Sequence, residues 1–67
     1  MQITINGEAR SFDAPLTLAA LIELLGLKLD RVAVEHNSTL LSRSQWAATS
    51  LAEGDRLEIV QFVGGGK

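Results

Sequence analysis

The first twelve residues alternate between apolar and polar side chains on both sides of a tight turn, and this pattern limits the possible folds most strongly. The segment 1–6 places Ile3 and Ile5 on one face, which is the period of two expected for a half-buried strand. An Asn-Gly pair follows, and both residues tolerate the positive φ of a type I′ turn. A return strand over 8–12, with Phe12 as its core anchor, completes a predicted antiparallel hairpin.

One amphipathic helix is predicted next, over about 18–25. Thr17 stands at the N-cap position, where its hydroxyl can accept a hydrogen bond from a backbone N–H of the first turn. Gly26 suits the left-handed residue that ends a helix. The apolar face of this helix has the spacing i, i+3, i+4 and i+7, and it comprises Leu18, Leu21, Ile22 and Leu25.

The second half of the chain contains two further strands separated by a less regular stretch. Residues 31–36 alternate, with both valines directed inward, and an Asn-Ser turn follows. A short strand at 40–41 and a helical turn within 42–48 fit the irregular stretch, whose Trp46 we expect to cap a satellite core. After a Glu-Gly-Asp turn, residues 56–63 form the last predicted strand.

This order of elements predicts an α+β fold in which one main helix packs on a mixed sheet of four or five strands. The last strand would lie beside the first, in parallel, at the centre of the sheet. That is the β-grasp (ubiquitin-like) arrangement. We expect residues 1–63 to form the β-grasp domain and residues 64–67 to form a flexible glycine-rich tail, because a glycine run cannot pack a core and is entropically costly to order.

The composition argues against several classes of function. The absence of cysteine removes disulfides, iron–sulfur ligation, zinc–thiolate sites and thiol catalysis. A net charge of −2 without a basic run argues against nucleic acid as a partner. No apolar segment is long enough to span a membrane, and we expect no secretory signal, because residues 1–6 alternate between apolar and polar side chains and do not form an apolar run. We therefore expect a cytoplasmic protein that binds no metal or cofactor of its own.

The last strand carries the first functional signal. If Leu57 and Ile59 point at the helix, Val60 and Phe62 point at solvent, because side chains alternate along a strand. Exposed apolar side chains in this position, together with Val63, predict a protein-binding patch. Two alternatives remain open. A bulge could turn the phenylalanine inward, or the irregular segment could cover it.

The glycine run Gly64, Gly65 and Gly66 carries the second signal. Directly after an apolar strand it would form a thin arm without Cβ atoms, able to enter a narrow active site on another protein and present a terminal carboxylate there. The alternative is a frayed chain end, which is common.

Other polar residues are interpreted as structural. His36 is the only histidine and is expected in a surface turn, without a carboxylate or a metal cluster beside it. Arg43 is interpreted as an ordinary surface arginine. The Glu-Gly-Asp sequence at 53–55 is explained by turn chemistry better than by metal binding.

Several short stretches of the sequence match the pattern of one family. Through them the chain resembles the ThiS family over essentially its full length. This family comprises the sulfur-carrier proteins of thiamine biosynthesis, which have a ubiquitin-like β-grasp fold. The stretches that carry the resemblance are 6–8, 17–18 with the helix after it, 32–37, 43–46 and 53–66.

The resemblance implies a mechanism and a set of partners. A ThiF-type adenylating enzyme would use ATP and magnesium to convert a terminal glycine carboxylate to an acyl-adenylate. Sulfur from cysteine, delivered through a cysteine desulfurase, would displace AMP and leave a thiocarboxylate. A thiazole synthase of the ThiG type would then take the sulfur. The chain itself would be a protein cosubstrate with no catalytic residues, not an enzyme.

One departure from the family pattern concerns Lys67, which follows the glycine that the family usually has last. With Lys67 attached, Gly66 has no free carboxylate to adenylate. A peptidase removes Lys67, or Lys67 is not native, or the protein is not an active carrier. We expect Gly66 to bear the sulfur after removal of Lys67, with Gly65 next if trimming goes further.

Other functions remain open at this point. The chain could carry sulfur for molybdopterin synthesis or for tRNA thiolation, although the molybdopterin subunits are generally longer. It could be a ubiquitin-like modifier that forms isopeptide bonds after the same adenylation. It could also be a plain β-grasp binding module with a frayed tail.

Overall fold

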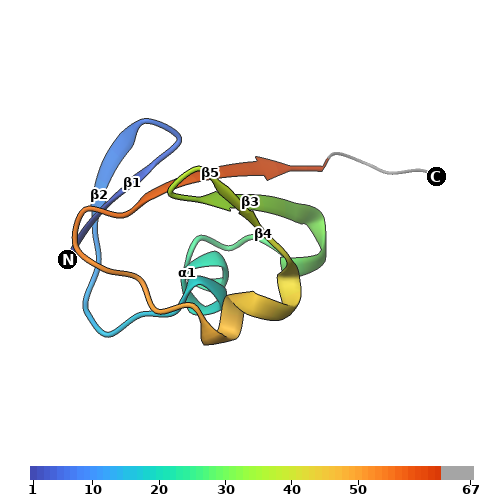
Figure 1. Cartoon of the computed structure of the whole chain (residues 1–67), viewed down its shortest axis with the longest axis horizontal. Helices are drawn as coiled ribbons and strands as arrows, with labels where there is room; N and C mark the ends of the chain where they lie inside the picture. Colours follow the sequence, from blue (N-terminus) through green and yellow to red (C-terminus); the bar gives the residue numbers. More distant parts are fainter. Residues whose placement is uncertain (63–67) are drawn as a thin grey trace.

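One α-helix lies against one face of a five-stranded mixed sheet (Figure 1). The computed structural model describes residues 1–62, so Val63, the predicted tail at 64–67 and the predicted domain boundary lie outside the described residues. In chain order the elements are β1 (Gln2–Ile5), β2 (Glu8–Ser11), α1 (Leu18–Leu24), the 3₁₀ helix η1 (Leu29–Arg31), β3 (Val32–His36), β4 (Thr39–Leu41), the 3₁₀ helix η2 (Arg43–Ala48) and β5 (Arg56–Gln61).

The strand order in the sheet is β2-β1-β5-β3-β4. β1 pairs antiparallel with β2 and parallel with β5, while β3 pairs antiparallel with both β4 and β5. The last strand therefore lies at the centre, beside the first and parallel to it. The predicted α+β class and β-grasp arrangement are confirmed.

The core forms where the inward positions of the strands meet the apolar face of α1. Its buried members are Ile3, Ile5, Leu18, Leu21, Ile22, Val32, Val34, Trp46, Leu51, Leu57 and Ile59. Phe12 packs against this core but is only partly buried, so it is a weaker anchor than predicted. The prediction of a satellite core at Trp46 was wrong, because its side chain is 2% exposed within the main cluster and its indole N–H donates to the Leu41 carbonyl at 3.3 Å.

Both ends of α1 follow from local sequence. The Thr17 hydroxyl accepts from the backbone N–H of Ala20 at 3.2 Å, as predicted for an N-cap. At the other end Gly26 has a φ of +76°, and its N–H donates to the Glu23 carbonyl at 3.0 Å. The N–H of Leu27 reaches back to the Ile22 carbonyl at 3.2 Å. These two bonds form a Schellman motif, which satisfies carbonyls that the end of the helix would otherwise leave free.

The irregular stretch is tied to the start of the helix by backbone hydrogen bonds. The Leu18 N–H donates to the Thr49 carbonyl, and the Leu51 N–H donates to the Leu16 carbonyl, both at 2.9 Å. The stretch thereby covers one side of the core while leaving the outer face of the sheet open. No helix among residues 1–62 is long and apolar enough to cross a membrane.

Candidate functional site

The exposed end of β5 is the candidate site. Leu57 and Ile59 are buried, whereas Val60 is 59% exposed and Phe62 is 53% exposed. The pairing of β5 with β3 runs without interruption from Leu57 to Gln61, so there is no bulge in this strand. The predicted outward orientation of Val60 and Phe62 is confirmed, and the alternative of a bulge was wrong. Their role in binding a partner stays a prediction.

An apolar patch extends from β5 onto the neighbouring strands. We define the outer apolar patch as Ala33, Leu40, Val60 and Phe62. The register places Ala33 beside Val60 on the next strand, and Leu40 on β4 is 69% exposed. Sequence reasoning missed Leu40, although it alternates with the partly buried Leu41 and so had to face outward.

The irregular segment borders the patch and does not cover it. An open hollow of about 450 Å³ lies beside Phe62, with Leu40, Arg43 and Trp46 among its lining residues. Because more than half of the Phe62 side chain is exposed, the alternative of a cover over this residue does not hold within the described chain. The outer apolar patch is therefore an exposed surface with a hollow at its edge.

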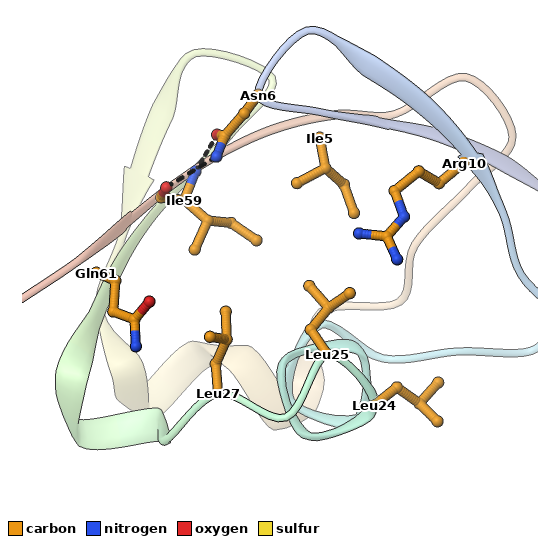
Figure 2. Close-up of a pocket in the computed structure, with 8 residues that line it drawn as sticks. All are labelled: Ile5, Asn6, Arg10, Leu24, Leu25, Leu27, Ile59 and Gln61. Carbon is orange, nitrogen blue, oxygen red and sulfur yellow. Dashed lines mark hydrogen bonds between the residues drawn. The ribbon is translucent and has the colours of Figure 1, made fainter.

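β5 is fixed in place by a side chain at the end of β1. The Asn6 carboxamide accepts from the Ile59 N–H at 2.7 Å and donates to the Ile59 carbonyl at 3.1 Å, as Figure 2 shows. The Asn6 backbone N–H donates to the Leu57 carbonyl at 2.9 Å. The carboxamide thus acts as one further rung of the parallel ladder and holds the end of the strand that carries Val60.

A second set of contacts holds the start of β5. The Asn37 carboxamide accepts from the Arg56 N–H at 2.9 Å and donates to the Asp55 carboxylate at 3.1 Å. The same carboxylate pairs with the His36 imidazole, with 2.9 Å between Nε2 and Oδ2, and accepts from the Ala52 N–H at 2.8 Å. The prediction that no carboxylate lies beside His36 was therefore wrong, because folding brings residues 19 positions apart into contact.

The pKa of Asp55 reflects these contacts. Partial burial acts to raise the pKa, but the hydrogen bonds from His36, Ala52 and Asn37 and the charge of His36 outweigh it. The net effect is a pKa below the ordinary value of 3.8. We therefore interpret this cluster as stabilising the turn before β5 and not as a catalytic group.

A second hollow, of about 370 Å³, opens on the helix side of the sheet. Figure 2 shows Leu24, Leu25 and Leu27 along one side of it, with the Arg10 and Gln61 side chains directed toward it. Neither hollow is lined by a carboxylate, a histidine or a cysteine. Within the described residues no group of three acidic, histidine or cysteine side chains is placed to hold a metal ion.

The remaining predicted site residues are Val63, Gly64, Gly65 and Gly66, together with Lys67 after them. All five lie outside the described residues. Of the predicted site residues, the structure places Val60 and Phe62.

Comparison with known proteins decides the family. The model of the ThiS family matches residues 3–66, which includes the described fold and the glycine run. The chain belongs to the ThiS family. The sulfur carrier protein ThiS of Escherichia coli is 32% identical over 66 residues, a match that covers 98% of this chain and 100% of that protein.

A solved member of the ThiS family has the same fold. The crystal structure of the thiamine biosynthesis protein ThiS from Geobacter metallireducens superposes with a TM-score of 0.83 at 33% identity, covering 98% of this chain and 100% of that one. This likeness agrees with the β-grasp arrangement of the five strands and the helix.

Two relatives are much longer proteins. A thiazole synthase of Paramagnetospirillum magneticum is 46% identical over 66 residues, and a thiazole synthase of Magnetococcus marinus is 42% identical over 67 residues. The chain spans only about a fifth of each of them, 20% and 21% respectively. Each of these proteins thus contains one segment similar to this ThiS-family chain within a larger polypeptide.

Proposed function

We propose that this chain is a sulfur-carrier protein that supplies the sulfur of the thiazole ring in thiamine biosynthesis. The observation that carries the proposal is the ThiS family match, which runs through Gly66 and so includes the residues that would do the chemistry. The names of the relatives, a ThiS sulfur carrier and two thiazole synthases, favour thiamine over molybdopterin or tRNA thiolation as the destination.

The proposed chemistry begins with activation of the Gly66 carboxylate. A free terminal carboxylate has a pKa of roughly 3.5, so it is an anion at neutral pH and a poor electrophile. A ThiF-type enzyme would join it to the α-phosphate of ATP, with magnesium, and release pyrophosphate. The outer sulfur of a persulfide, formed from cysteine by a desulfurase, would then displace AMP. A thiol, such as that of cysteine, would reduce the resulting acyl disulfide and leave the thiocarboxylate, from which thiazole synthase takes the sulfur.

In this scheme the chain acts as a cosubstrate and not as a catalyst. Val60 and Phe62, with Val63, would dock the body on the partner, while Gly64 to Gly66 deliver the carboxylate. ATP and magnesium would bind to the adenylating enzyme. The Gly66–Lys67 peptide bond must be hydrolysed first, because a peptide carbonyl cannot be adenylated in this way; further trimming would leave Gly65 as the acceptor.

Complementation of a thiamine-requiring bacterial strain that lacks its own carrier tests the proposal. A chain that ends at Gly66 is expected to restore growth without thiamine, and a chain shortened to end at Gly64 is expected not to. Both chains retain every described residue, so a difference between them reports on the arm and not on folding. Equal growth with both chains, or growth with neither, would contradict a carrier role in this pathway.

A further inference from the structure

The outer face of the sheet carries negative charge next to its apolar patch. The register places Glu35 of β3 directly opposite Glu58 of β5, two positions along each strand from the Ala33–Val60 pair and on the same face. Leu40 of β4 lies opposite Glu35 on its other side. Two carboxylates therefore border the outer apolar patch. α1 covers the opposite face of the sheet (Figure 1).

This placement costs the free protein stability, because like charges directly opposite on neighbouring strands repel. Among residues 1–62 the only ion pair joins His36 and Asp55, so neither glutamate has a lysine or arginine within pairing distance there. Arg56 is the nearest cationic residue along β5, two positions before Glu58 and on the same face of the strand. The pair thus presents negative charge to whatever covers the patch.

The hollow at the edge of the patch adds a shape requirement. This hollow of about 450 Å³ is lined by Leu40, Phe62 and Arg43 among other residues. Most of its lining side chains are apolar, so an apolar side chain fits this recess. The charge of the two glutamates and the shape of the hollow together indicate what a partner surface must present to this face.

We propose that the partner docking on this face inserts an apolar side chain beside Leu40 and Phe62 and places a lysine or arginine over Glu35 and Glu58. The inference rests on the proposed function, in which the partner is the adenylating enzyme. The two glutamates repel each other and destabilise the free chain, but in the complex they attract the lysine or arginine of the partner. Leu40 then belongs to the docking surface together with Val60 and Phe62.

The first test concerns the role of Glu35 and Glu58 in binding. It measures the affinity of the chain for the adenylating enzyme at low and at high salt. The double variant Glu35→Gln/Glu58→Gln is expected to bind about tenfold more weakly at low salt and to lose most of the salt dependence of the wild type. The control Glu8→Gln/Glu23→Gln removes the same charge from other exposed positions and should bind as the wild type does. The first variant should melt no lower than the wild type, which excludes unfolding as the cause.

A matched pair of leucines tests the shape. Leu40 is 69% exposed on the patch, and Leu24 is 67% exposed at the end of α1. Leu40→Ala should weaken binding, while Leu24→Ala should leave it unchanged. Equal effects of the two leucine variants, or wild-type affinity and salt dependence in the double glutamine variant, would overturn the inference.

Binding does not require turnover, so the result stands apart from the test of function. A chain that complements the thiamine-requiring strain and yet shows no effect of the glutamines leaves the carrier role intact and refutes this inference. A wild-type chain that does not bind the adenylating enzyme at all refutes both.

Discussion

Two asparagines hold the central strand by their side chains. Asn6 and Asn37 each begin a hairpin turn with a φ of +51°, which an asparagine tolerates. Each carboxamide then satisfies a backbone N–H of β5, that of Ile59 or that of Arg56. Sequence reasoning predicted both turns from local chemistry but not these bonds, because they join residues 53 and 19 positions apart.

Replacement of Asn6 tests this role. Asn6→Ala should lower the free energy of unfolding by about 2–3 kcal/mol, since it leaves the partly buried Ile59 N–H without its partner and places alanine at a positive φ. Urea denaturation measures the change. Asn6→Gly removes the same hydrogen bonds without the strain at φ, so it should fall between alanine and the wild type. Wild-type stability in both variants would show that the carboxamide contributes nothing.

The Asp55 cluster predicts a pH dependence. Because the folded pKa of Asp55 lies below its ordinary value of 3.8, its contribution to stability is complete above about pH 5 and is lost as the pH falls through the folded pKa. Asp55→Asn should therefore be less stable at pH 7 and lose stability less steeply on acidification. Thermal melts from pH 7 to pH 3 measure both effects. Asp13→Asn, which removes an exposed carboxylate outside the cluster, should keep the wild-type slope; the same slope in Asp55→Asn would refute the assignment.

Elements with local start and stop signals were the most predictable. Thr17 and Gly26 bracket α1 as expected, and the Asn-Gly and Asn-Ser turns set the registers of both hairpins. The stretch around η2 was less predictable, because the burial of Trp46 depends on the distant residues that surround it and not on a local period. The same limit applies to Phe12, whose burial depends on how far β2 extends.

The N-cap of α1 gives a prediction at this scale. Thr17→Ala should cost about 1 kcal/mol of stability, because the Ala20 N–H loses the hydroxyl that caps it. Thr17→Ser keeps a hydroxyl at the same position and should lie close to the wild type. Chemical denaturation of the three proteins measures the difference. An alanine variant as stable as the serine variant would mean that the cap contributes little.

Across the whole molecule, one face of the sheet is packed and the other is open. The alternation along β5 was enough to predict that Val60 and Phe62 face outward, and the structure confirms it. The contribution of Leu40 and the opposition of Glu35 and Glu58 required the strand register, which the sequence alone did not specify. The predicted site is thus one edge of a larger surface.

Because Val60 is exposed on this face, replacing it should affect adenylation of the chain much more than its stability. Val60→Thr keeps the shape and strand preference of valine and adds a hydroxyl, so stability should change by less than about 1 kcal/mol. The hydroxyl would be buried without a partner in the complex, and kcat/KM for adenylation should fall by about tenfold. Pyrophosphate exchange measures this. Leu24→Gln, an exposed change on the helix, should have no effect; an equal loss in both variants would contradict docking through the patch.

The mass of the intact chain after reaction tests the carrier role most directly. A chain ending at Gly66 is incubated with the adenylating enzyme, ATP, magnesium, a cysteine desulfurase and cysteine, beside the same chain with Lys67 attached. We predict that the first gains the mass difference between sulfur and oxygen and that the second is unchanged. An unchanged mass for the chain ending at Gly66, under conditions in which a known carrier is converted, would contradict the central claim.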